Sequence, residues 1–179
     1  MGGAVRRSLQ SSQPLPSVAA GLVINAIRLL MGWMWLQQVQ WKMPPDWGCT
    51  PNRDRGLCDW IQREIDYPLI PLYRDILVGF VQPNLDWFGG VVWAVELVIA
   101  VALLLGLFTK IGALLATGMG INLLIGLWNV PHEWYWTYVF LIFVSIFLFL
   151  ANAGRPLGLD HVIQPRLASR LPRALRWLV

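Results

Sequence analysis

Apolar residues are concentrated in four long runs, which cover roughly residues 17–39, 87–108, 111–130 and 134–153. Each run is about 20 residues long, the length that an α-helix needs to cross a hydrocarbon core of about 30 Å. The pattern predicts an all-α integral membrane protein with a four-transmembrane-helix bundle. An insertion at 43–86 separates the first two helices. Within it, the stretch at 70–81 is interpreted either as an amphipathic helix on the surface or capping the bundle, or as a loop that packs.

Two charged residues interrupt these runs near their middles, Arg28 in the first and Glu96 in the second. An ionisable side chain at the centre of a membrane costs roughly 2.5–3.5 kcal/mol, so both are expected to face the bundle interior and to form an ion pair with each other. Two interpretations remain open. The pair either only sets the register of the helices, or it lines a cavity in which one side chain binds a carbonyl group or relays a proton.

Small and polar residues recur at helical spacing within the runs. In the first run they share one face, formed by Gly21, Asn25, Arg28 and Gly32. The third run carries two such rows, Gly112/Ala116/Gly120 and Gly118/Asn122/Gly126. Rows of this kind let membrane helices approach closely. We interpret Asn122 first as a hydrogen-bonding residue of the bundle and second as a ligand contact.

Composition and charge agree with a membrane protein and suggest its orientation. Hydrophobic residues make up 56% of the chain, charged residues only 13%, and the mean hydropathy is +0.54. Arg6 and Arg7 precede the first run, Lys110 separates the second from the third, and five arginines follow the fourth, counted from Arg155. By the positive-inside rule, both termini are cytoplasmic, and the insertion is extracytoplasmic in a multi-pass protein of the plasma membrane.

The chain accordingly divides into a cytoplasmic tail at 1–16, a membrane domain at 17–160 and a basic amphipathic tail at 161–179. The first run is interpreted as a retained signal-anchor helix, because no small-residue cleavage site ends it. The C-terminal tail is expected to lie on anionic lipid or to dock a partner subunit. Because the membrane accounts for the basic pI of 9.5, nucleic acid is not an expected partner.

The two cysteines, Cys49 and Cys58, both fall in the insertion and bracket a polar turn. An extracytoplasmic compartment is oxidising, which favours a disulfide between them over free thiols. No cluster of His, Cys or carboxylate residues has the spacing of a metal site. The sequence therefore predicts no metal and no tightly bound cofactor.

Tryptophans gather in the half of the membrane that the orientation places outside. Trp33, Trp35 and Trp93 lie deeper than an interfacial belt requires. Aromatic walls with a few polar groups suit a planar ring. These residues predict a pocket in the outer leaflet.

Three stretches carry a family resemblance: LLMGWMWLQQVQWK after Arg28, VQPNLDWFGGVVWAVELVIAVALLLGLFTKIGALLATGMGINLLIG, and AGRPLGLD. In them the chain resembles the DoxX family, and is most similar to the DoxD type, the membrane subunit of thiosulfate:quinone oxidoreductase. The resemblance implies a four-helix membrane protein in an assembly that passes electrons from a small anionic sulfur compound to quinone. By matching position, it also implies that Arg28, Lys42 and Glu96 are site residues.

Two functional hypotheses follow. In the first, the protein is a subunit of a quinone-linked oxidoreductase, with other membrane subunits, lipid and quinone as partners. Its catalytic residues would be Arg28 and Glu96, and its ligand-binding residues Lys42, Trp33, Trp93 and Asn122. In the second, the protein is a non-catalytic accessory subunit that braces a larger respiratory or photosynthetic complex. A small-solute or lipid transporter is a minor third interpretation.

Overall fold

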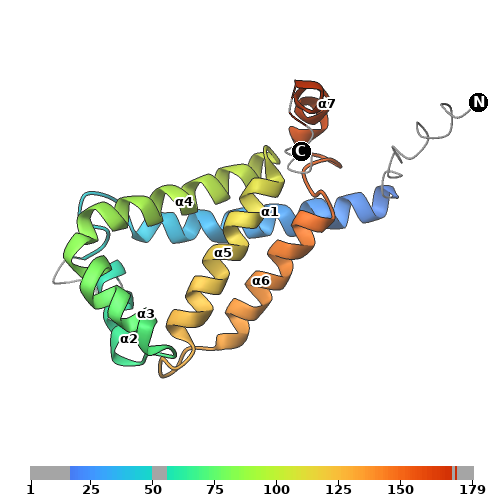
Figure 1. Cartoon of the computed structure of the whole chain (residues 1–179). Helices are drawn as coiled ribbons and strands as arrows, with labels where there is room; N and C mark the ends of the chain where they lie inside the picture. Colours follow the sequence, from blue (N-terminus) through green and yellow to red (C-terminus); the bar gives the residue numbers. More distant parts are fainter. Residues whose placement is uncertain (1–16, 50–55, 171, 173–179) are drawn as a thin grey trace, which may run out of the picture.

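The computed structural model describes residues 17–49, 56–170 and 172, and every element within them is helical (Figure 1). The elements are α1 (Val18–Trp41), α2 (Leu57–Asp66), α3 (Pro71–Ile76), the π-helix η2 (Leu77–Val81), the 3-10 helix η3 (Gln82–Asn84), α4 (Leu85–Leu105), α5 (Thr109–Leu127), α6 (Tyr135–Leu150) and α7 (Asp160–Arg170). The predictions for the tail at 1–16 and for residues 171 and 173–179 lie outside the described residues.

Three helices are long and apolar enough to cross a membrane: α1, the continuous helix Pro71–Leu105, and α5. The prediction of an all-helical fold is thereby confirmed for the described residues, together with the prediction of helices that are long and apolar enough to span a membrane. The fourth apolar run forms α6, which has 16 residues and ends before Asn152, whose φ of 51° is incompatible with a continued helix. A fourth crossing therefore stays a prediction. The stretch at 70–81 is helical rather than a loop, and it runs on directly into α4.

The long helices pack as two pairs, α1 with α4 and α5 with α6, and α4 and α5 join the pairs. Figure 1 shows the pairs close together near α7 and spread apart toward the opposite end, where α2 and α3 lie across the gap. We call these the α7 end and the α2/α3 end. Because the pairs diverge, the side chains between them do not form one continuous core.

Glycines make the close contacts within each pair. A Cβ on Gly32 of α1 would lie 2.9 Å from the backbone nitrogen of Leu104 in α4, and one on Gly120 of α5 would lie 2.9 Å from Cγ1 of Ile142 in α6. Larger residues at these positions would force the helices apart. The predicted roles of these two small-residue rows as packing faces are confirmed.

Two separate hydrophobic cores result. The larger lies at the α7 end and is built from α1, α4, α5, α6 and the residues just after α6, with Trp35, Ile99, Leu103 and Leu148 among its buried members. The smaller lies at the α2/α3 end and consists of Leu57, Ile61, Ile65, Leu77 and Val81. The space between the two cores is where the candidate site lies.

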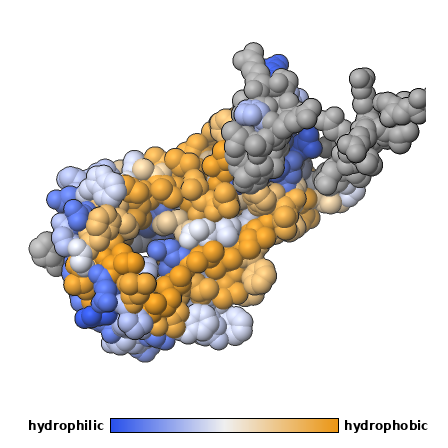
Figure 2. Space-filling model, viewed as in Figure 1, coloured by the Kyte–Doolittle hydropathy of each residue, from blue (hydrophilic) through white to orange (hydrophobic). Residues whose placement is uncertain are grey.

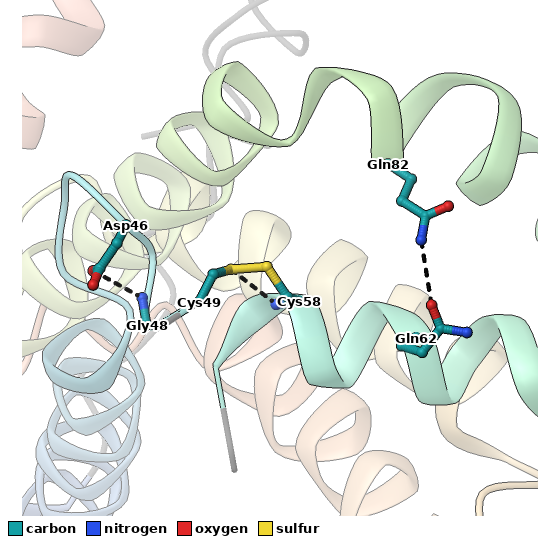
Figure 3. Close-up of a disulfide and its surroundings, with 6 residues drawn as sticks. All are labelled: Asp46, Gly48, Cys49, Cys58, Gln62 and Gln82. Atoms are coloured by element: carbon teal, nitrogen blue, oxygen red, sulfur yellow. Dashed lines mark hydrogen bonds between the residues drawn. A yellow bond between two sulfur atoms is a disulfide. The ribbon is translucent and has the colours of Figure 1, made fainter. Parts of the chain in front are cut away.

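The disulfide predicted between Cys49 and Cys58 is confirmed (Figure 3). Cys49 follows the turn after α1, in which the backbone N–H of Gly48 donates to Asp46 Oδ1 at 3.2 Å. Cys58 lies in the first turn of α2, which is joined to η3 by a hydrogen bond from Gln82 Nε2 to Gln62 Oε1 at 3.3 Å. The disulfide therefore links the end of α1 to the helices that cover the gap.

We expect the double variant Cys49→Ser/Cys58→Ser to lose about 2–3 kcal/mol of unfolding free energy, because the disulfide closes a short loop with a sequence separation of 9. Equilibrium unfolding in mixed micelles measures this loss. The wild-type protein treated with a reductant is the control and should lose a similar amount. A variant as stable as the oxidised protein would show that the disulfide does not hold α2 in place.

Candidate functional site

A cavity of about 1270 Å³ lies between the two helix pairs, with α2, α3 and η2 along its outer side. We call it the central cavity. Most of its wall is apolar, with side chains from all four long helices, among them Met31, Val95, Met119 and Val144. Figure 2 shows an opening between two bands of hydrophobic surface, with hydrophilic atoms visible inside it. The cavity is thus an apolar space that contains a small number of polar groups.

One of these polar groups is a buried ion pair between Lys42, directly after α1, and Glu96, in α4. Lys42 Nζ donates to Glu96 Oε1, and the two side chains are only 6% and 2% exposed. The Lys42 ammonium also lies 4.4 Å from the ring centroid of Trp41, a cation–π contact. The second carboxylate oxygen, Glu96 Oε2, is buried without a hydrogen-bond partner among the described residues. The wall of the cavity therefore contains an ion pair with unused hydrogen-bonding capacity.

The predicted ion pair between Arg28 and Glu96 is wrong. The Arg28 guanidinium instead donates to the carbonyl oxygens of Leu103 and Leu104, the latter at 3.1 Å, and to Asn25 Oδ1. These carbonyls lie seven and eight positions beyond Glu96 in α4, about 10–12 Å along the helix axis. Because α1 and α4 pack in this register, Arg28 meets the C-terminus of α4, where a cation is favourable.

Arg28 consequently has a structural position and does not line the central cavity. The prediction that Arg28 and Glu96 lie at similar depth came only from their positions within the two apolar runs. Lys42 lies just past the apolar run, so counting gave no sign that its long side chain belongs beside Glu96. The family resemblance was the signal that singled out Lys42.

Asp160, the first residue of α7, is a structural residue that was not among the predicted site residues. Its carboxylate accepts hydrogen bonds from the backbone N–H groups of Phe108 at 2.7 Å and Thr109 at 2.9 Å. These groups begin α5, where a carboxylate is favourable. A Cβ on Gly154 would lie 2.1 Å from Asp160 Oδ2, so only glycine leaves room there. Through Gly154 and Asp160, the stretch AGRPLGLD thus packs against the turn between α4 and α5 and stabilises it by hydrogen bonds.

Of the three deep tryptophans that predicted a pocket, only Trp35 lines the central cavity, and the two proposed as ligand-binding residues do not. Trp33 is 52% exposed on the outside of α1, and neither it nor Trp93 lines the cavity. The wall contains Trp35, Trp41 and Trp60 instead. Depth alone does not distinguish a cavity-facing tryptophan from a lipid-facing one, because that depends on how the helix is rotated against its neighbours. Trp35 is 2% exposed, and its indole Nε1 has no hydrogen-bond partner among the described residues.

A second polar group in the cavity joins three helices, and we call it the Glu64 cluster: Glu64 of α2, Tyr73 of α3 and Asn122 of α5. The Tyr73 hydroxyl donates to Glu64 Oε2 at 2.8 Å, and its oxygen lies 3.3 Å from Asn122 Oδ1. All three residues line the central cavity. Asn122 therefore lies within hydrogen-bonding distance of a side chain from another helix and also lines the cavity.

Glu64 is buried against the backbone of α5, because a Cβ on Gly126 would lie 2.4 Å from its carboxyl carbon. Burial raises the pKa of Glu64 to about 7, although the hydrogen bond from Tyr73 acts in the opposite direction. The carboxyl group is thus ionised in only part of the molecules at neutral pH. Neither Glu64 nor Tyr73 was predicted from the sequence, since both lie in the insertion, where a charged or polar residue is unremarkable.

We expect Gly126→Ala to destabilise the protein by about 1–3 kcal/mol, because the new methyl group overlaps the Glu64 carboxyl group. Gly118→Ala, on the same helix, is the matched control. A Cβ at Gly118 meets nothing within 4 Å, so this variant should gain about 0.5–1 kcal/mol from helix propensity. Equal stabilities of the two variants would contradict the close packing of Glu64 on α5.

The charges in the cavity wall are mainly negative. Glu133, in the turn before α6, accepts a hydrogen bond from the Tyr138 hydroxyl at 2.8 Å, and both residues line the cavity. Among the described residues that line the cavity, Glu133, Glu64 and Glu96 are acidic, and Lys42 is the one basic residue. This wall suits neutral or hydrogen-bond-donating ligands better than anions. Within the described part of the chain, no group of three or more His, Cys, Asp or Glu residues could hold a metal ion.

The site therefore combines an apolar, partly aromatic cavity with a buried ion pair and a separate carboxyl–phenol cluster. Such an arrangement can bind an amphiphile whose polar ring is held by hydrogen bonds and whose tail lies among apolar side chains. Comparisons of the chain with protein-family models, with curated proteins and with solved structures find no match.

Proposed function

We propose that the protein is the membrane subunit of a quinone-linked oxidoreductase and that it binds quinone in the central cavity. The observation that carries the proposal is the buried Lys42–Glu96 pair in the cavity wall, in which one carboxylate oxygen has no hydrogen-bond partner among the residues that the structure describes. The ammonium group of Lys42 has three N–H donors, so it can bond a ring carbonyl while it keeps its contact with Glu96. Glu96 Oε2 can accept a hydrogen bond from a hydroxyl group of the reduced ring.

The shape of the cavity supports the same ligand class. Its volume exceeds the range of roughly 300–1000 Å³ that is usual for small-molecule sites. A quinone ring with part of its isoprenoid tail is of that size and chemistry. The indole N–H group of Trp35 can donate a hydrogen bond to a ring carbonyl, and Trp41 and Trp60 add aromatic surface.

A small anionic sulfur compound is a less suitable occupant, because three carboxylates face one cation in the wall. We propose that oxidation of such a donor takes place on a partner subunit outside the cavity. In our proposal, the protein lies in the plasma membrane with both termini in the cytoplasm. The disulfide-bonded α2/α3 end then faces the oxidising compartment, in agreement with the distribution of basic residues.

Quinone binding by the purified protein tests the proposal. The protein, isolated with mild detergent and reconstituted in nanodiscs, is titrated with a decyl-substituted 1,4-benzoquinone, and its lipid extract is searched for native quinone by mass spectrometry. We expect saturable binding and co-purified quinone. Mass spectrometry of the co-purifying proteins should identify oxidoreductase subunits.

Trp35→Phe and Trp33→Phe form a matched pair for this test. Trp35→Phe removes the N–H donor in the cavity without breaking a protein hydrogen bond, and we expect it to weaken binding about fivefold, as the loss of one hydrogen bond predicts. Trp33→Phe changes an exposed side chain outside the cavity and should leave the affinity unchanged. Absence of saturable binding, or equal effects of both variants, would show that the cavity is not a quinone site.

A further inference from the structure

The Glu64 cluster is separate from the Lys42–Glu96 pair and comes from different helices. Glu64 is 6% exposed, Tyr73 donates to it, and Gly126 leaves space for its carboxyl group on α5. Burial of a carboxyl group in an apolar region costs free energy unless its oxygens form hydrogen bonds. The hydrogen bond from Tyr73 is to only one of these oxygens, Oε2. The position of the cluster in the cavity wall makes its remaining hydrogen-bonding capacity available to an occupant.

Two further polar atoms of the cavity wall have unused hydrogen-bonding capacity. Among the described residues, Glu96 Oε2 and Trp35 Nε1 are buried without partners, and both residues line the cavity. Their side chains are 98% or more buried, so these atoms are far from open solvent. One is an acceptor and the other a donor. A quinol hydroxyl group can donate and accept, and a quinone carbonyl group can accept, so a side-chain rotation that exposes either atom to the cavity allows a bond to the ring.

We propose that Glu64 determines which redox form of the ligand the cavity prefers. Ionised Glu64 accepts a hydrogen bond from the hydroxyl group of a quinol, whereas protonated Glu64 donates one to the carbonyl group of a quinone. This inference rests on the proposed function, because it names a specificity-determining residue of the same cavity.

The chemistry of the two ligand forms makes this discrimination possible. A quinone ring offers only acceptors, so it needs a donor, whereas a quinol hydroxyl group can donate to a carboxylate. An ionised carboxyl group only accepts and forms the stronger, charge-assisted bond with a quinol, whereas a protonated one gains the O–H donor that a quinone needs. The pKa of Glu64 is raised to about 7 by burial, so the change takes place in the neutral range.

The other charged and titratable groups around Glu64 are few. Tyr73 and Arg74 come from α3, and Arg74 Nε donates to the Ile65 carbonyl at 3.3 Å. Glu133 and its partner Tyr138 are the groups from the turn before α6 and from α6 itself, and both line the same cavity. Asn122 on α5 does not titrate.

The test compares the dissociation constants of a decyl-substituted 1,4-benzoquinone and of its quinol at pH 6 and pH 8, under argon, with the reconstituted full-length protein. A pKa near 7 leaves about one tenth of Glu64 ionised at pH 6 and about nine tenths at pH 8. We therefore expect the quinol to bind up to about tenfold more tightly at pH 8 and the quinone to bind more weakly by a similar factor. Glu64→Gln should abolish both trends.

Three variants complete the experiment. Asp66→Asn removes an exposed carboxylate from the same helix and should keep the wild-type pH dependence. Glu133→Gln tests the other carboxyl group of the cavity wall, and loss of the pH dependence in that variant instead of in Glu64→Gln would assign the role to Glu133. Tyr73→Phe removes the hydrogen bond that lowers the pKa of Glu64, so the midpoint of the binding profile should move to higher pH. This variant provides a readout should Glu64→Gln fail to fold.

The outcomes distinguish this inference from the proposed function. Saturable binding with the same pH dependence in wild type and Glu64→Gln would overturn the role of Glu64 and leave the quinone site standing. Failure of the wild-type protein to bind either form would overturn both. Opposite pH trends for quinone and quinol that vanish in Glu64→Gln support both.

Discussion

Lys42→Met is expected to lower the unfolding free energy by about 3–5 kcal/mol, because it leaves Glu96 as an unpaired charge in a buried position. Glu96→Met should cost a similar amount for the converse reason. The double variant Lys42→Met/Glu96→Met removes both charges and should recover most of the loss, since an apolar pair of similar volume often replaces a buried ion pair without cost. Unfolding in mixed micelles, with all four proteins in one double-mutant cycle, measures the coupling.

The exposed pair Arg63–Asp59 on α2 provides the control for this cycle. Its side chains are 40% and 35% exposed, and its coupling energy should stay at about 0.2–1 kcal/mol. If the losses at Lys42 and Glu96 are simply additive, the two residues do not act as a pair. A folded double variant that no longer binds quinone would further agree with the proposed site.

Arg28→Gln is expected to cost about 3–5 kcal/mol, because hydrogen bonds from a charged donor to the carbonyls of Leu103 and Leu104 are lost. Those carbonyls lie at the C-terminal end of α4, where Arg28 is fully buried. The turn between α4 and α5 should loosen at the same time. Thermal unfolding and hydrogen exchange of residues near Gly106 measure the two effects.

Arg63→Gln, the same change at a partly exposed position, should shift stability by less than about 1 kcal/mol. Arg28 lies outside the central cavity, so the folded fraction of Arg28→Gln should bind quinone as the wild type does. Normal stability of the variant combined with lost binding would contradict the structural role and restore Arg28 as a site residue.

The positions of Gly106 and Gly158 show why Arg28 has this role. Gly106 ends α4 with a φ of 63°, and a Cβ there would lie 2.5 Å from Gly158 and 2.9 Å from the Arg28 guanidinium. The backbone N–H of Asp160 donates to the Gly106 carbonyl at 2.8 Å. Arg28 from α1 and Asp160 from α7 therefore hold the two ends of one turn, which is the point where the helix pairs meet.

Much of the fold could be predicted from local pattern. Hydrophobic runs of membrane-spanning length determine helices, because a backbone in hydrocarbon has to satisfy its hydrogen bonds internally. The small-residue faces and the disulfide were also predictable, since each depends on residues a few positions apart or on two cysteines in one segment. The full length of the second spanning helix could not be predicted. Residues 71–84, which continue this helix toward its N-terminus, include polar residues and a proline, and a hydropathy pattern therefore predicts that the helix starts after them.

The candidate site was predictable only in part. Glu96 and Asn122 stand out in the sequence because a polar residue in an apolar run is costly, and both do line the cavity. The partner of Glu96 was predicted wrongly, because depth along two helices says nothing about their relative register. Trp33 and Trp93 were chosen over Trp41 and Trp60 for a similar reason, as rotation about a helix axis decides which tryptophans face inward.

The sequence by itself thus determined that the protein is helical, that it is apolar enough for a membrane, and that Glu96 needs a partner. Only the tertiary structure decided that this partner is Lys42, that Arg28 ends α4, and that Glu64 shares the cavity. The physical reason is the divergence of the two helix pairs. Helix formation depends on neighbours in sequence, whereas the cavity exists because two well-packed pairs meet at one turn and leave the space between them to be covered by α2 and α3.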